Sequence, residues 1–180
     1  MEERAARRAG APVARLGGGL PEGPLVSFGL AGALAGDLPA GTVVAARRVV
    51  DEEGGTLWEG EPFPVPGGRA VVVCAASRIV DAPAERAALA ARTGAEVVDL
   101  ESGRLAASGR LAGVVRVVSD TPAAPLGRLA GAVTPNGETD VLAAARAFLL
   151  APRGAVRAAR GARRAVRALE PAARALAREP

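Results

Sequence analysis

The sequence predicts an α/β domain with a central mixed, largely parallel sheet flanked by helices. The chain has 180 residues, of which 49% are hydrophobic, enough to bury a sizeable core. In its second half, short β-branched runs alternate with helical segments rich in small residues, a pattern typical of parallel strands joined by helices. We therefore divide the chain into an α/β domain, residues 1–150, and an Arg/Ala-rich C-terminal helical segment, residues 151–180.

The expected elements follow the apolar runs and the turn residues between them. The segment 83–93 reads as a helix, with Pro83 in its first turn and Gly94 as its stop. The segment 51–68 is rich in glycine and proline and reads as an irregular connection, or alternatively as a flap over a site. The other expected strands are 13–16, 25–28, 43–50, 69–75, 95–99 and 113–118, and the other expected helices are 1–10, 102–109 and 141–150.

The composition excludes several kinds of chemistry. The chain has no histidine, which excludes a Ser-His-Asp triad and a histidine-based metal site. All 23 basic residues are arginine, and the absence of lysine excludes Schiff-base chemistry and a P-loop. The one cysteine, Cys74, follows three valines and reads as a buried core residue rather than a nucleophile.

The two ends of the chain bear on location and partners. The N-terminus is charged rather than apolar, and no apolar run approaches the ~18 residues of a membrane span, so we expect a cytoplasmic protein. Residues 153–178 combine eight arginines with Ala, Val and Leu, including an imperfect apolar stripe from Val156 to Leu169. This helix is expected to pack on the sheet or to contact an anionic membrane surface peripherally. Nucleic-acid binding has less support because no aromatic residue interleaves the arginines.

Two strand ends carry the candidate chemistry. The segments 97–102 and 114–120 each read as a buried valine-rich strand that delivers a carboxylate, Glu101 and Asp120 respectively. The carboxyl ends of strands in an open α/β sheet form the crevice where ligands bind. Two acids there suit proton transfer and hydroxyl binding. The alternative is that Glu101 caps a helix and Asp120 starts a loop.

Glycines mark two further candidate ligand contacts. Gly29 and Gly32 follow the strand 25–28 and would let a loop approach a bound molecule without a Cβ in the way. The triple glycine 17–19 permits an anion nest beside Arg15, or is a flexible turn.

Four motifs in order resemble those of the nucleoside phosphorylase superfamily. The resemblance is to the methylthioadenosine/S-adenosylhomocysteine nucleosidase-like branch, and within it to the hopanoid-associated phosphorylases (adenosylhopane nucleosidases). It covers about residues 1–170, including the arginine-rich tail. The matching segments are Ser27-Phe28-Gly29-Leu30-Ala31-Gly32-Ala33-Leu34, residues 39–50, Thr93-Gly94-Ala95-Glu96-Val97-Val98-Asp99-Leu100-Glu101-Ser102 and Arg116-Val117-Val118-Ser119-Asp120.

The resemblance implies a role for each matched site residue. Asp120 corresponds to the acid that protonates or hydrogen-bonds the purine N7, and Glu101 to the carboxylate that holds the ribose hydroxyls. Glu2, or alternatively Glu3, corresponds to the glutamate that positions the attacking water. The other implied substrate-binding residues are Gly29, Ala31, Gly32, Leu100 and Ser119; Leu100 stands where the family usually has Met.

The implied activity is cleavage of the N-glycosidic bond of an adenine nucleoside, releasing the free base. A 5′-lipid-linked substrate such as adenosylhopane would suit a basic segment at a membrane surface. No metal and no cofactor are expected; phosphate is a possible co-substrate in place of water. A homodimer is expected by resemblance. A proton donor at the base and a carboxylate at the sugar would stabilise both ends of the transition state.

The N-terminal part departs from the family pattern. The chain begins where the family has completed its first strand, so we expect either that the domain lacks that strand or that the start has been placed too late. Residues 19–25 leave room only for a turn where the family carries a helix. The alternative function is therefore an inactive or truncated phosphorylase-like protein that binds a nucleoside or a partner chain.

Overall fold

The computed structural model describes residues 22–35, 37–127 and 152–177. The predicted elements 1–10, 13–16 and 141–150 lie outside these residues, as do Glu2, Glu3 and the triple glycine. The described strands are β1 (Leu25–Ala33), β2 (Val43–Val50), β3 (Thr56–Glu59), β4 (Arg69–Ala75), β5 (Val97–Asp99) and β6 (Leu111–Asp120). The described helices are α2 (Pro83–Thr93), α3 (Ser102–Ala107) and α5 (Pro152–Leu176).

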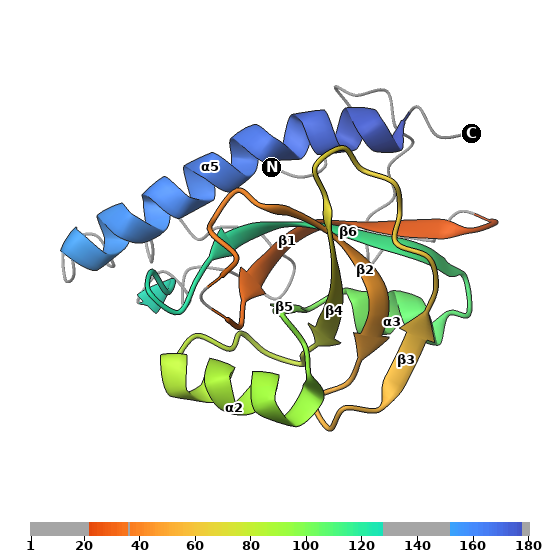
Figure 1. The fold of residues 1–180 in the computed structure, drawn as a ribbon, viewed down its shortest axis with the longest axis horizontal. Helices are drawn as coiled ribbons and strands as arrows, with labels where there is room; N and C mark the ends of the chain where they lie inside the picture. Colours follow the sequence, from red (N-terminus) through yellow and green to blue (C-terminus); the bar gives the residue numbers. More distant parts are fainter. Residues whose placement is uncertain (1–21, 36, 128–151, 178–180) are drawn as a thin grey trace.

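The sheet closes on itself. The strand order is β3-β2-β4-β5-β1-β6, and an additional pairing between β2 and β6 makes a ring of five strands with β3 outside it on β2 (Figure 1). Within the described part of the chain, three strand pairings are parallel and three are antiparallel. The predicted mixed sheet is confirmed, but the prediction of a largely parallel, open sheet is wrong.

The length of the connections explains the difference. Strands β4 and β5 are joined by the 11-residue helix α2 and run parallel, as predicted. The connection from β5 to β6 spans only residues 100–110, including the short helix α3, and is shorter than the dozen or more residues that a crossover between parallel neighbours needs. Strand β6 instead pairs with β1 in parallel, and β1 runs antiparallel to β5.

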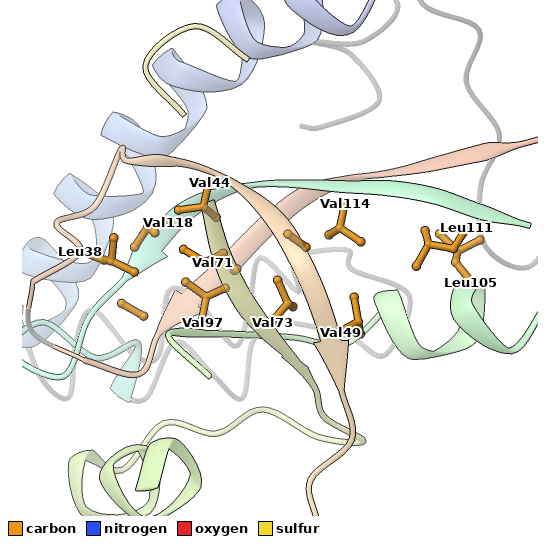
Figure 2. Packing of buried hydrophobic residues seen from close by; sticks show 13 residues of the cluster. Leu38, Val44, Val49, Val71, Val73, Val97, Leu105, Leu111, Val114 and Val118 are labelled. Carbon is orange, nitrogen blue, oxygen red and sulfur yellow. The ribbon is translucent and has the colours of Figure 1, made fainter. Parts of the chain in front are cut away.

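Valines fill the inside of the ring. The main core cluster takes side chains from all five ring strands and Leu105 from α3, and Figure 2 shows them converging between the strands. β-branched side chains suit this environment because they pack well on a pleated surface. Cys74 is fully buried in a second cluster with Leu89 of α2, so its predicted core position is confirmed.

The segment 51–68 is more regular than predicted. Strand β3 lies within it and pairs antiparallel with β2, placing Trp58 opposite Val49. Trp58 packs against the main core cluster. The sequence pattern concealed this strand because it has only four residues among glycines and prolines.

Helix α5 packs along β6 and β1 (Figure 1). The expectation of a helix packed on the sheet is thus confirmed, but the predicted apolar stripe is displaced. Val156 is 42% exposed, and the buried stripe consists of Leu169, which the prediction included, and four alanines: Ala158, Ala165, Ala172 and Ala173. Among the described residues no helix is long and apolar enough to cross a membrane.

Candidate functional site

Asp99 and Arg116 form a buried ion pair beneath the end of β5. The Arg116 Nε lies 2.6 Å from Asp99 Oδ2, and neither side chain is exposed by more than 2%. Arg116 Nη2 also donates to Ser27 Oγ at 2.5 Å and to Ser102 Oγ at 3.2 Å. Burying a charged pair is costly unless its hydrogen bonds are satisfied, and the two hydroxyls help to satisfy Arg116.

Glu101 lies at the exposed side of this pair. Its side chain is 42% exposed, and its Oε2 is 3.6 Å from Arg116 Nη2. Glu101 is the N-cap residue of α3, as the alternative predicted, but its side chain makes no capping hydrogen bond. Asp99 takes that role: its Oδ1 accepts the backbone N–H of Ser102 at 3.1 Å. Arg116 therefore holds one buried carboxylate and one that reaches solvent.

Asp120 ends β6 in a second buried ion pair. Its Oδ2 accepts a hydrogen bond from Arg86 Nη2 of α2, and the two residues are 3% and 1% exposed. Its Oδ1 accepts a hydrogen bond from Ser119 Oγ at 2.5 Å. Asp120 belongs to the strand, so the alternative in which it opens a loop is wrong. Both of its carboxylate oxygens have partners within the protein.

Arg86 links Asp120 to the segment that follows β6. Its Nη1 donates to the carbonyl of Ala33 at 2.8 Å, and its Nη2 is 3.5 Å from Asp81 Oδ1. The Asp81 carboxylate also accepts the backbone N–H groups of Leu126 and Gly127, each at 2.8 Å. One guanidinium is thus shared between two carboxylates, with Asp120 much the closer.

Arg86 was not predicted from the sequence as a site residue. The available signal was its spacing: Arg86, Leu89 and Thr93 are three and four residues apart, as on one face of a helix. All three are buried in the structure. An arginine on the buried face of a helix needs an acidic partner, and the strand-end aspartate could have been considered for it.

Gly32 makes room for the Arg86–Asp120 pair. It lies on β1 opposite Val98 of β5 and opposite Asp120 of β6. A Cβ at this position would lie 3.0 Å from Asp120 Oδ2 and 3.4 Å from Arg86 Nη1. Gly29 and Gly32 lie within β1, so the prediction that a loop follows residue 28 is wrong, and the close neighbours of Gly32 are the side chains of this ion pair.

The remaining predicted residues are distributed along β1 and its neighbours. Gly29 lies opposite Arg116, the partner of Glu101. The side chain of Ala31 is in the main core cluster, and its carbonyl oxygen lies 3.2 Å from Ser119 Oγ. Leu100 is 39% exposed.

The carboxylates of Asp120 and Glu101 lie at different points along β1 and not at one edge of the sheet. Asp120 is opposite Gly32, while Glu101 reaches the arginine opposite Gly29, three residues along β1, or about 10 Å. The prediction that β5 and β6 deliver them at a common edge is wrong because these strands point in opposite directions.

Other chemistries find little support in the described residues. Burial raises the pKa of the Cys74 thiol to about 12, with nearby Glu52 and Asp99 adding to the effect. A thiol that keeps its proton is a poor nucleophile. In the described ranges no group of three or more ligating side chains could hold a metal ion.

Solved structures share this arrangement of strands and helices. The 5′-methylthioadenosine/S-adenosylhomocysteine nucleosidase of Helicobacter pylori, solved with butyl-thio-DADMe-Immucillin-A, aligns with a TM-score of 0.51. The fold is that of these nucleosidases. The H. pylori alignment covers 85% of this chain and 66% of that one at 15% identity. The S. pneumoniae nucleosidase, solved with the inhibitor MT-ImmA, gives a TM-score of 0.50 at 14% identity, covering 85% and 70%.

The likeness to nucleosidases concerns the fold and not the sequence. A futalosine hydrolase mutant of H. pylori aligns at 15% identity with a TM-score of 0.43, over 53% of this chain and 58% of that one. The chain thus spans less than two thirds of the length of the first structures it matches. No protein-family model matches the sequence, and no curated protein matches it.

Proposed function

We propose that this chain cleaves the N-glycosidic bond of a purine nucleoside, with Asp120 at the base and Glu101 at the ribose. One observation carries the proposal: in a nucleosidase fold, two carboxylates lie beside the same strand, each held by a buried arginine. Because both flank β1, one can serve the base and the other the sugar of a single molecule.

The two carboxylates would act on opposite charges. As the bond breaks, negative charge develops on the purine and positive charge on the ribose. A proton transferred from Asp120 to the purine N7 neutralises the negative charge on the base. The Glu101 carboxylate at the ribose hydroxyls stabilises the positive charge on the sugar. Arg116 favours this role for Glu101 because its guanidinium orients the exposed carboxylate.

Arg86 would regulate the proton on Asp120. Its guanidinium pairs with the Asp120 carboxyl group, so transfer of a proton from Asp120 requires this contact to rearrange. Asp81, already 3.5 Å from Arg86 Nη2, offers that guanidinium an alternative partner while Asp120 is protonated. Once the proton has moved to N7, the new carboxylate regains Arg86, which stabilises the product of the transfer.

The finer features of the substrate come from the sequence resemblance. We propose adenine as the base and a 5′-linked apolar group, such as the hopane of adenosylhopane, as the substituent. Either water or phosphate would attack the anomeric carbon. Comparing 5′-substituents, and comparing reactions with and without phosphate, separates these choices.

A second candidate is a non-catalytic nucleoside-binding protein. It is favoured by the engagement of both Asp120 oxygens, one by Arg86 and one by Ser119. If this network persists with a ligand bound, Asp120 has no proton to give. The protein would then bind the nucleoside without cleaving it.

The test measures adenine release from adenosine and from a 5′-alkyl adenosine, together with equilibrium binding of each. We expect release by the wild type, and a loss of roughly 10²–10⁴-fold in Asp120→Asn. Asp37→Asn is the matched control, because Asp37 makes only an exposed ion pair with Arg69 and should leave the rate unchanged. Binding without release would favour the second candidate, and neither binding nor release would reject both.

A further inference from the structure

The outer side of α5 carries a row of exposed arginines. We define the arginine stripe as Arg157, Arg160, Arg163, Arg164 and Arg167, all of which are exposed. Their spacings of three and four residues place them within about a third of the helix circumference, along roughly 15 Å of axis. The buried alanines and Leu169 occupy the opposite side, against β6 and β1. The fold therefore orients the stripe outward.

Within the part of the chain that the structure describes, no acidic side chain neutralises this charge. None of the five stripe arginines has an ion-pair partner among those residues, whereas Arg174, further along the same helix, pairs with Glu170 at 2.6 Å. Like charges three and four residues apart destabilise a helix. Arg160 and Arg164, and likewise Arg163 and Arg167, are four residues apart. The unrelieved repulsion indicates an anionic partner outside the described chain.

The neighbours of the stripe favour a lipid surface over a nucleic acid. Val156 precedes Arg160 by four residues, so it lies on the same side, where it is 42% exposed. An exposed valine beside arginines with apolar stems suits the boundary between lipid head groups and acyl chains. Helix α5 has no aromatic residue to stack on bases.

We propose that the arginine stripe of α5 binds an anionic lipid surface, with the helix remaining docked on the sheet. Because the stripe covers only about a third of the helix circumference, all five side chains can reach a flat anionic layer together. The apolar face of α5 is already buried in the protein, so attachment depends on charge, with Val156 as a shallow contact. Such binding is reversible and weakens as salt screens the charges. This inference does not depend on the proposed nucleosidase activity.

The experiment is co-sedimentation of the full chain with vesicles at low and high salt. One set is phosphatidylcholine alone and the other is phosphatidylcholine mixed with phosphatidylglycerol. We expect binding to the anionic vesicles only, and its loss at high salt. Removing two stripe charges in Arg160→Gln/Arg164→Gln should weaken binding about thirtyfold, since each arginine near an anionic surface contributes about 1 kcal/mol. This variant also removes a repulsive pair, so α5 should remain folded.

The matched control is Arg47→Gln/Arg104→Gln, which lowers the net charge equally at exposed arginines of β2 and α3. It should change vesicle binding less than about twofold if the stripe is the contact. Equal weakening in both variants, or no binding to anionic vesicles at low salt, would overturn the proposal. Tighter, stripe-dependent binding to a short DNA duplex would overturn it in favour of a nucleic-acid partner.

Discussion

Arg86 of α2 and Asp120 of β6 form an ion pair that is almost completely removed from solvent, although 34 residues separate them in sequence. The pair ties the helix to the end of the strand that carries the candidate acid. It also defines the space beside Gly32, where any side chain would meet both charges. Stability and the proposed chemistry therefore depend on the same contact.

We expect Arg86→Met to lower the free energy of unfolding by about 3–5 kcal/mol, because it leaves the buried Asp120 charge without its main partner. The double variant Arg86→Met/Asp120→Asn should cost less than the sum of the single variants, since neither charge is then left alone. Urea denaturation of the four proteins measures this coupling.

Arg69→Met is the control for the ion pair, because Arg69 pairs with Asp37 at 3.1 Å with both side chains about half exposed or more. Exposed pairs contribute about 0–1 kcal/mol. If Arg86→Met costs no more than Arg69→Met, the Arg86–Asp120 pair does not exist in solution as described.

The second prediction concerns Gly32→Ala. The added methyl would sit 3.0 Å from Asp120 Oδ2 and 3.4 Å from Arg86 Nη1, so the pair must shift. We expect a loss of about 1–3 kcal/mol in unfolding free energy, as for other overpacked sites. The loss should shrink in the Arg86→Met/Asp120→Asn background, where the charged contact is already gone. An equal loss in both backgrounds would assign the effect to the strand backbone instead.

The elements could be predicted from sequence more readily than their directions. Valine runs marked β4, β5 and β6, and Pro83 with Gly94 marked both ends of α2, because these signals are local. Closure of the sheet depends on β2 pairing with β6, a contact between residues 70 to 74 positions apart in sequence. No local pattern encodes that pairing, so the direction of β6 relative to β5 was predicted wrongly.

The candidate site, too, could be predicted from sequence only in part. Glu101 and Asp120 stood out because each follows a valine run. Their arginines did not, because 23 arginines dilute the information in any one of them. Arg116 was nevertheless detectable in principle: a charged residue flanked on both sides by Val-Val belongs to a buried strand and requires a partner such as Asp99.

The third prediction tests how α5 packs on the ring of strands. Gly161 faces β6 so closely that an added Cβ would lie 2.6 Å from the carbonyl oxygen of Ser119. Gly161→Ala should therefore destabilise the protein by about 1–3 kcal/mol despite the better helix propensity of alanine. Gly154→Ala is the matched control in the same helix, where nothing lies within 4 Å. It should be neutral or stabilising by up to about 1 kcal/mol.

Thermal denaturation of both glycine variants measures the difference. Opposite signs for the two substitutions are expected because only one of them contacts the sheet. A stabilising effect of Gly161→Ala would show that α5 does not lie against Ser119 in solution.

The last prediction concerns the free energy of unfolding at alkaline pH. Burial raises the pKa of Cys74 from 9.0 to about 12 in the folded protein. Between these values the unfolded chain has lost the thiol proton while the folded chain keeps it, so the unfolded state binds fewer protons. Stability should therefore fall as pH rises from about 9 to about 12, by at most about 1.4 kcal/mol per pH unit.

This sequence isolates the Cys74 effect unusually well. It contains no lysine and no tyrosine, so no other side-chain type that ordinarily titrates in this window is present, and arginine stays charged through it. Urea unfolding of the wild type and Cys74→Ala at successive pH values gives the measurement. The variant should be less stable near neutrality, because it loses a buried side-chain atom, yet should lack the alkaline decline. Parallel declines in the two proteins would mean that the Cys74 thiol ionises in the folded state as readily as in the unfolded chain.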